Sequence, residues 1–258
     1  MALIAVICGL KSEAAVVRKS VGEENIRIGI SGADAGRAYE LAYAACQDGA
    51  AAVISIGVSG GLDPVLAPGD LVIGSAIIAE DGGQYEADQY LLNSLLSAHS
   101  RASGNPALQD MEPAALDPGF RREKRSKEGA RIKLGTLFGS DAIISSPAHK
   151  AALFANHAAI AVDMESHGAA RAASEANVPF IAIRAIADPA DRALPKAALG
   201  AVAPDGSTRV LKTLFDAMKA PAQFPALMQL GSDSNKALAT LSGALPEIFD
   251  RLFGALDR

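Results

Sequence analysis

Along the chain, short apolar runs alternate with longer segments in which apolar residues recur every three or four positions. Residues 2–8 are apolar at every position, which is typical of a strand buried on both faces, and Gly9 marks the turn that ends it. By the same criteria, strands are predicted over 26–30, 51–56, 70–78, 132–138, 159–163 and 179–186, and helices over 12–19, 33–48, 89–97, 147–154 and 165–176. This alternation predicts the α/β class, with an open, twisted, mainly parallel central sheet and helices on both faces.

The pattern becomes helical after Pro195, with predicted segments near 196–202, 208–219, 222–230 and 234–255. We therefore expect an α/β domain over 1–195 and a helical C-terminal extension over 196–258 that packs on the same domain. The extension carries large apolar residues at helical spacing: Leu211, Leu214, Phe215, Met218, Leu238, Leu241, Leu245, Phe249 and Phe253. Packing in a core or a dimer is the usual explanation of such a pattern, and an apolar surface for a lipid-linked ligand is the alternative.

Composition and charge exclude several classes of protein. Half of the 258 residues are hydrophobic and 21% are charged, so the chain can bury a sizeable core. The net charge of −5 argues against a nucleic-acid partner, and two cysteines are too few for a disulfide framework. A signal peptide carries basic residues before its apolar run, and no basic residue precedes the first apolar run here. No run reaches the ~18 apolar residues of a spanning helix. We expect a cytoplasmic protein without stable membrane insertion.

Candidate chemistry lies directly after several predicted strands. Parallel sheets bind ligands at the carboxyl ends of their strands, which selects residues 57–61, 140–145, 163–165 and 188. Residues 57–61 read Gly-Val-Ser-Gly-Gly, whose glycines let backbone N–H groups approach a ligand closely, although a tight turn explains them equally well. The segment lacks both the GxGxxG pattern of dinucleotide sites and the Lys-Ser/Thr pair of a P-loop.

Acidic residues stand where predicted helices begin. Asp163 and Glu165 lie at a strand-to-helix junction, and Glu13 opens the first helix. One explanation is that acids favour the positive end of the helix dipole. The other is functional, because a carboxylate at a strand end can accept hydrogen bonds from the two vicinal hydroxyls of a sugar.

Arg184 interrupts the apolar strand that ends at Asp188. Because charges are rarely buried unpaired, Arg184 must face a carboxylate or an anionic ligand. Asp188 precedes Pro189, which favours an extended backbone there. Asp188 is either an ordinary loop cap or a partly desolvated acid whose raised pKa allows it to donate a proton.

Taken in order, these segments resemble the purine nucleoside phosphorylase and methylthioadenosine nucleosidase superfamily over roughly residues 2–195. The resemblance rests on residues 53–62 (VISIGVSGGL), 68–72 (PGDLV), 139–144 (GSDAII), 161–165 (AVDME) and 178–188 (VPFIAIRAIAD). A narrower resemblance, to the hopanoid-associated phosphorylases, rests on residues 163–173, 186–206 and 221–230. Those enzymes are thought to remove adenine from adenosylhopane.

The resemblance implies a three-layer α/β/α fold with a mixed, mainly parallel central sheet, and it implies a role for each acid. Asp188 matches the acid that protonates purine N7 as the glycosidic bond breaks. Glu165 matches the carboxylate that binds the ribose hydroxyls, and Met164 packs under the sugar.

It also implies the binding residues around these acids. Ser59 and Gly60 would line the ribose and nucleophile site, Ile143 would stack against the base, and Arg184 would orient the acid. Neither a metal nor an organic cofactor is implied.

The nucleophile stays open at this point, as either phosphate or water. Nucleosidases of the superfamily carry an acidic cluster in the first loop, one member of which positions water, and here Glu13 is its only acid. Val58 and Ala187 stand where nucleosidases have serine. Phosphate users hold the anion with Gly, Ser and Arg, which Ser59 and Gly60 could supply in part.

The expected function is phosphorolytic release of adenine from a nucleoside with an apolar 5′ substituent, namely adenosylhopane, with inorganic phosphate as co-substrate. Hydrolysis of methylthioadenosine- or adenosylhomocysteine-like nucleosides is the first alternative. A non-catalytic nucleoside-binding protein is an alternative of another class. The expected partners are a small, lipid-linked nucleoside and further copies of the chain in a homo-oligomer, without nucleic acid.

Overall fold

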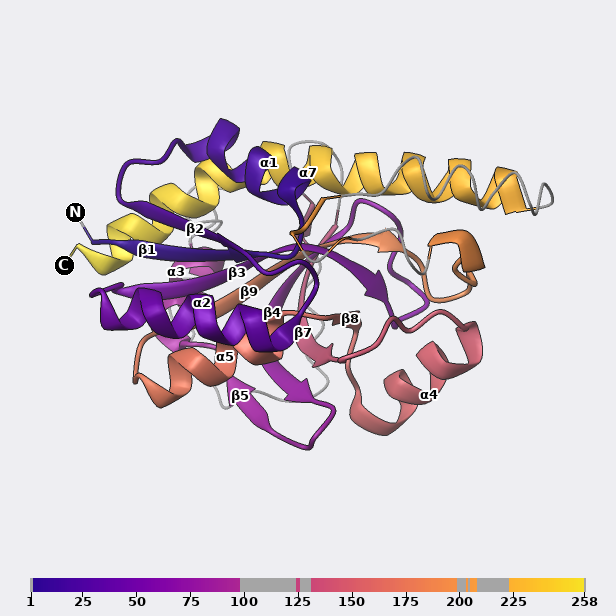
Figure 1. The fold of residues 1–258 in the computed structure, drawn as a ribbon, viewed down its shortest axis with the longest axis horizontal. Coiled ribbons are helices and arrows are strands. Elements are labelled where there is room, and N and C mark those ends of the chain that lie inside the picture. The colour runs from indigo at the N-terminus through magenta and orange to yellow at the C-terminus, as the bar shows by residue number, and fades with distance from the viewer. Residues whose placement is uncertain are drawn as a thin grey trace, which may run out of the picture.

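The computed structural model describes residues 2–97, 124–125, 131–198, 203, 205–207 and 223–257. A central sheet carries helices on both faces (Figure 1), which confirms the predicted α/β class. The strands are β1 (Ile4–Cys8), β2 (Ile26–Ile30), β3 (Ala52–Gly61), β4 (Leu71–Ala79), β5 (Gln84–Glu86), β6 (Lys124–Arg125), β7 (Arg131–Gly139), β8 (Ala161–Asp163) and β9 (Phe180–Asp188). The helices are α1 (Lys11–Val21), α2 (Ala35–Gln47), α3 (Gln89–Ser97), α4 (Pro147–His157), α5 (Ser166–Glu175) and α7 (Phe224–Leu256), with a 3₁₀ turn at Lys196–Ala198.

The sheet is mixed, and part of it closes on itself. β3 pairs in parallel with β1 and β9, while β9 pairs antiparallel with β4. β4 then pairs in parallel with β7, β7 with β8, and β8 returns antiparallel to β3. The expectation of an open sheet is therefore wrong for these five strands. Next to Ser59 and Gly60 the pairing on β9 passes from Ile186 to Asp188, so the bulge lies in β9. Gly60 pairs with both Asp188 of β9 and Val162 of β8, and this double pairing closes the ring of strands.

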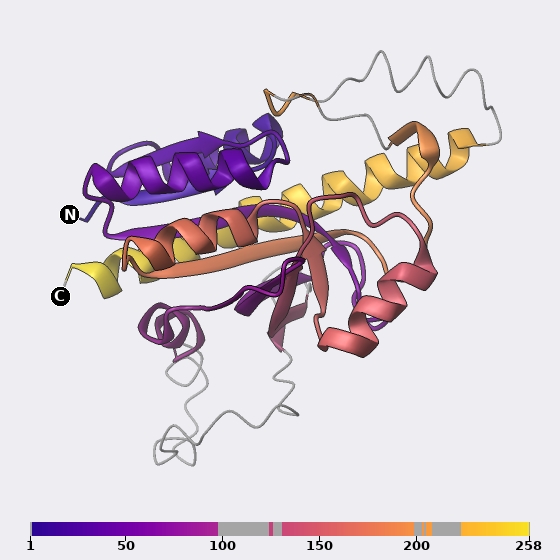
Figure 2. The same cartoon turned by 60° about the horizontal axis from the view of Figure 1, so that its bottom comes forward.

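Two helical layers cover the sheet. α2 and α5 pack on one face through small residues, and the closest approach is at Gly168, where a Cβ would lie 2.0 Å from the carbonyl oxygen of Ala35. α1, α3 and α7 cover the other face. Both views place α4 apart from these layers, near one end of the molecule (Figures 1 and 2). The three-layer arrangement agrees with the expected architecture.

α7 is one continuous helix, although two helices over 222–230 and 234–255 were predicted. The helix continues through Gly231 and Ser232, which are exposed, and its buried positions begin at Asp233. The predicted helix over 208–219 lies outside the described residues.

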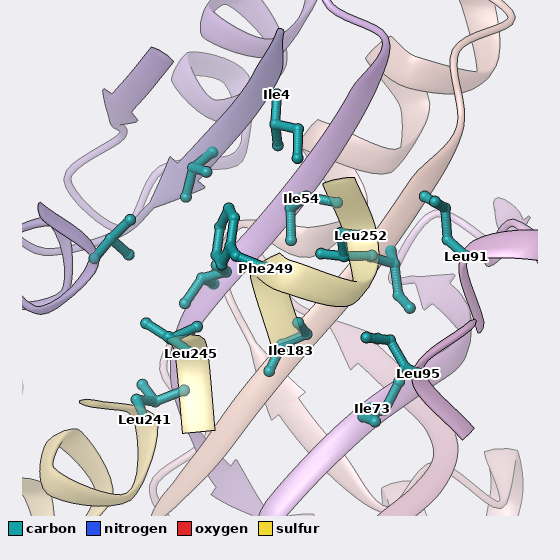
Figure 3. Close-up of a cluster of buried hydrophobic side chains, with 14 of the residues drawn as sticks. Ile4, Ile54, Ile73, Leu91, Leu95, Ile183, Leu241, Leu245, Phe249 and Leu252 are labelled. Carbon is teal, nitrogen blue, oxygen red and sulfur yellow. The ribbon is translucent and has the colours of Figure 1, made fainter. Parts of the chain in front are cut away.

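The apolar face of α7 is part of the main core. Leu241, Leu245, Phe249 and Leu252 are fully buried and pack with residues of the sheet and α3 (Figure 3). Core packing thus explains this half of the pattern, and the alternative of an exposed apolar surface is wrong for these side chains. Among the described helices, none combines the length and the apolar character needed to cross a membrane.

Candidate active site

The carboxyl ends of β3, β8 and β9 bring together the charged residues that the sequence singled out. Arg184 of β9 is 1% exposed and reaches β8, where its Nε lies 3.0 Å from Oδ2 of Asp163. Its Nη2 lies 3.7 Å from Oε2 of Glu165 and donates to the hydroxyls of Ser55 and Ser166. The prediction that Arg184 faces a carboxylate is confirmed. Its neighbours are the acids of the β8–α5 junction, so the expectation that Arg184 orients Asp188 is wrong.

Asp163 is the structural partner of this arginine. Its Oδ1 accepts hydrogen bonds from the backbone N–H groups of Glu165 at 2.9 Å and Ser166 at 2.7 Å, so it also caps the start of α5. Burial works against its ionisation, but Arg184 and the hydrogen bonds from Ser166 hold the pKa of Asp163 below its ordinary value. Asp163 therefore stays a carboxylate that balances Arg184.

Glu165 has the opposite electrostatic character. Burial, followed by the negative charge of Asp163, raises its pKa to about 8, although Arg184 opposes the change. The backbone of β1 passes close by, because a Cβ on Gly9 would lie 2.3 Å from Oε1 of Glu165. A glycine is thus needed at the end of β1 for this carboxyl to fit.

Glu13 is buried against β3, although the sequence also allowed a simple first-turn acid. Its Oε2 accepts from the Leu10 N–H and its Oε1 from the Val58 N–H, each at 2.8 Å. A Cβ on Gly57 would lie 2.8 Å from Oε1, so this glycine admits the carboxylate to the strand. Burial raises the pKa of Glu13, and the amide hydrogen bonds oppose that change.

Asp188 lies at the end of β9 and is 6% exposed. Its Oδ2 accepts a hydrogen bond from Nζ of Lys150, a fully buried residue of α4, whereas its Oδ1 is buried without a hydrogen-bond partner among the described residues. Burial raises the pKa of Asp188, and the hydrogen bond and charge of Lys150 oppose this rise. The structure therefore supports a desolvated acid here and not an exposed loop cap.

Lys150 is the residue that the sequence analysis missed. It shares a helix face with Leu153 and Phe154, which belong to a buried apolar cluster. A lysine on the apolar face of a helix needs a buried partner, so its spacing was a usable signal. The identity of the partner was not available from the sequence.

The remaining predicted binding residues differ in how the fold holds them. Ser59 is buried, and its hydroxyl has no hydrogen-bond partner among the described residues. Gly60 pairs with Asp188 in the β3–β9 register, so the glycine-rich segment is the end of a strand and not a tight turn. Met164 is half-buried between the acids of the β8–α5 junction, whereas Ile143 is 40% exposed in the loop after β7. The roles assigned to these four residues stay predictions.

Two hollows of about 410 Å³ each have linings that do not include the acids of this cluster, although the first adjoins it where the Gly32 N–H donates to the carbonyl of Gly9. One is lined by residues of the loop after β2 and the start of α2, and the other by residues near β5 and the end of α5. The second lies at the opposite ends of the strands from Asp188, so chemistry and not hollow size identifies the site. Within the described part of the chain, no group of three or more His, Cys, Asp or Glu side chains is placed to hold a metal ion.

The raised pKa of Glu165 predicts how stability depends on pH. The unfolded chain ionises this carboxyl near its model value of 4.5, whereas the folded chain keeps the proton up to about pH 8. Between these values the folded state binds more protons, so the free energy of unfolding falls as the pH rises. We expect Glu165→Gln to reduce the fall in Tm between about pH 5 and about pH 8, measured by differential scanning calorimetry. An unchanged slope would show that Glu165 ionises normally in the folded protein.

The sequence of the chain is similar to a known protein family and to a curated protein of known activity. The family model described as the phosphorylase superfamily matches residues 25–218. Futalosine hydrolase from Streptomyces coelicolor is 31% identical over 155 residues, a match that covers 60% of this chain and 56% of that protein. The chain therefore spans just over half the length of this curated relative.

Solved structures show the same fold at low sequence identity. The 5′-methylthioadenosine/S-adenosylhomocysteine nucleosidase from Neisseria meningitidis, in complex with methylthio-immucillin-A, is 18% identical with a TM-score of 0.66, covering 96% of this chain and 99% of that one. A futalosine hydrolase mutant of Helicobacter pylori is 14% identical with a TM-score of 0.67, covering 98% and 99%. These likenesses support the α/β architecture with its C-terminal helix.

Proposed function

Because the chain belongs to the phosphorylase superfamily, we propose that it is an enzyme that cleaves the N-glycosidic bond of a purine nucleoside and releases the base, with water as the nucleophile. The observation that carries the proposal is the gathering of Asp188, Glu165 and Glu13 at neighbouring strand ends, each buried and each with a raised pKa. Desolvated acids with shifted pKa values are typical of catalytic sites.

Asp188 is the proposed general acid. A purine leaves poorly as an anion, and a proton delivered to N7 lets it leave as a neutral molecule. General acid catalysis of this kind contributes about 10²–10⁴-fold to a rate. Oδ1 of Asp188 is buried and has no hydrogen-bond partner among the described residues, which supports this role because a substrate nitrogen can supply such a partner.

Glu165 is the proposed ribose-binding group. Burial and the negative charge of Asp163 raise its pKa to about 8. Two ribose hydroxyls would donate hydrogen bonds to it and favour the carboxylate form. A carboxylate beside the sugar then stabilises the positive charge that develops as the glycosidic bond breaks.

Glu13 favours water over phosphate as the nucleophile. Its Oε1 already accepts a hydrogen bond from the N–H group of Val58. Val58 belongs to the glycine-rich segment, so this N–H group is not available to an anion. Arg184 faces Asp163 and Glu165, so the charge of this arginine is balanced within the fold. A phosphate here would meet a carboxylate, whereas a water molecule could donate a hydrogen bond to it. Phosphorolysis, which was expected from the sequence, stays a prediction, and measuring base release with and without phosphate tests it.

The 5′ substituent of the nucleoside also stays a prediction. Adenosylhopane rests on the sequence resemblance of residues 163–173, 186–206 and 221–230 to the hopanoid-associated phosphorylases. The names of the similar proteins indicate futalosine and methylthioadenosine or adenosylhomocysteine as further compounds to test. We also propose that the chain self-associates and that it is cytoplasmic.

The deciding experiment measures base release with and without inorganic phosphate. The substrates are adenosine with a long apolar 5′ group, methylthioadenosine and futalosine. We expect equal release in both conditions and free ribose derivatives as the second product. Release that requires phosphate and yields a ribose-1-phosphate would overturn the assignment of water and establish a phosphorylase.

Glu13→Gln is expected to lower the rate of hydrolysis about 100-fold, because the amide cannot accept the proton of the attacking water. The KM should change little, since Glu13 is assigned to the nucleophile and not to the nucleoside. Glu24→Gln is the matched control, because Glu24 follows the same helix and is exposed. Equal rates for the Glu13 variant and the control would remove Glu13 from the mechanism.

A further inference from the structure

Lys150 is fully buried, and each of its three N–H donors is used. Nζ donates to Oδ2 of Asp188, to the carbonyl of Pro189 at 2.8 Å and to the carbonyl of Arg192 at 3.1 Å. Three acceptors match the three donors of an ammonium group, so this environment favours the charged form. Lysine is rarely buried completely unless it is paired, and here its only carboxylate partner among the described residues is Asp188.

The two oxygens of Asp188 are therefore not equivalent. Oδ2 is held by Lys150, while Oδ1 is buried and has no partner in the described part of the chain. Because a carboxyl is planar, fixing one oxygen also fixes the direction of the other. The lysine thus selects which oxygen of Asp188 is left for a substrate.

Resting on the proposed function, we propose that Lys150 is a positioning residue for Asp188 and the counter-ion of the carboxylate that forms when this acid gives up its proton. In that step the proton leaves Oδ1 for purine N7, and the electron pair of the bond between C1′ and N9 passes to the purine. The base leaves neutral, and Asp188 becomes a buried anion. The Lys150 ammonium, already bonded to Oδ2, balances this new charge without any rearrangement.

The lysine also connects the acid to the C-terminal helix. Arg192, whose carbonyl accepts from Lys150, forms an ion pair with Asp233 of α7. Gln229, one turn earlier on α7, donates to the other oxygen of Asp233 at 3.0 Å. The charged groups that face Asp188 are thus Lys150 from α4, Arg192 from the loop after β9 and Asp233 from α7. This network holds the loop after β9 next to Asp188.

Burial and Lys150 change the pKa of Asp188 in opposite directions, so removing the lysine predicts the direction in which the pH profile moves. Burial raises the pKa of Asp188 and so favours its protonated form, while Lys150 lowers that pKa and makes the proton easier to give up. Activity that requires protonated Asp188 falls as the pH rises through its pKa. Removing the lysine charge must therefore move this falling limb to higher pH while slowing the proton transfer.

The experiment records the pH profile of kcat for Lys150→Met and Lys150→Gln. Met removes both charge and hydrogen bonds, whereas Gln keeps a donor and so guards against simple misfolding, which circular dichroism checks. We expect kcat to fall at least about 10-fold in both variants. We expect the high-pH limb to move upward by about one pH unit or more.

Lys133→Met is the matched control. Lys133 is also buried and lies 3.3 Å from a buried carboxylate, that of Asp63. Its loss should lower Tm but leave the limb where it is, because this lysine does not contact Asp188. A limb that moves equally in the control, or that stays in place in both Lys150 variants, would overturn the inference.

A double-mutant cycle separates this inference from the proposed function. In an Asp188→Asn background the acid is absent, so Lys150→Met should lower kcat by less than it does in the wild type. If Asp188→Asn alone keeps full turnover, the proposed acid is wrong. If Asp188→Asn is inactive while the Lys150 variants keep the wild-type rate and limb, the acid stands and the role of Lys150 fails.

Discussion

Asp188→Asn is expected to lower the turnover of nucleoside cleavage at least about 100-fold, while the nucleoside still binds. The amide has nearly the shape of the carboxyl but cannot transfer a proton to the purine. Turnover is measured as base release under saturating substrate, and binding by isothermal titration calorimetry with a non-hydrolysable nucleoside analogue. A large fall in kcat with a nearly unchanged Kd is the signature of a group that acts in the transition state.

The control for this variant is Asp191→Asn, which changes an exposed carboxylate in the loop after Asp188. It should leave kcat within about twofold of the wild type, since surface substitutions rarely disturb a distant geometry. Full turnover in Asp188→Asn would reject general acid catalysis at this position, whichever nucleophile the enzyme uses. Loss of binding without loss of kcat would instead make Asp188 a recognition group.

Arg184→Met is expected to lower the free energy of unfolding by about 3–5 kcal/mol, because it leaves the buried carboxylate of Asp163 without its cation. Arg184 is 1% exposed, and both Asp163 and Glu165 are buried beside it. Since a whole domain is stable by only about 5–15 kcal/mol, this variant should unfold at much lower urea concentration. Urea titration followed by circular dichroism measures the effect.

Two further variants test the origin of that loss. Arg171→Met removes an exposed arginine that lies over the Tyr39 ring and should cost no more than about 1 kcal/mol. Adding Asp163→Asn to Arg184→Met should recover part of the stability, because the unpaired buried carboxylate is then neutral. A double variant no more stable than Arg184→Met would show that lost packing and not unpaired charge is responsible.

Local sequence patterns predicted where the site lies, but they predicted few of the contacts within it. A run of apolar residues identifies a buried strand, and the polar residues at its end lie at the edge where ligands bind. This reasoning selected Asp188, Glu165 and the glycine-rich end of β3 before any contact was known. It also required a carboxylate partner for Arg184, because an arginine within a buried strand cannot stay unpaired.

The partners themselves depended on distant parts of the chain. Glu13 reaches Val58 because glycine at position 57 leaves room for its carboxylate, and α1 carries it there. Gly60 and Gly61 at the end of β3 also pair with β8, which closes a sheet that the pattern predicted to be open. Neither effect has a local signature, because each depends on the register of strands far apart in the sequence.

The sequence by itself determined the α/β class, most of the strands and helices, and the edge of the sheet that carries the acids. These features depend on hydrophobic periodicity and strand-end position, which are properties of short segments. Only the tertiary structure decided that Arg184 pairs with Asp163, that Lys150 holds Asp188, and that α7 continues as one helix into the core. Such pairings are set by burial, because a charge removed from water must find whichever opposite charge the packed elements bring within reach.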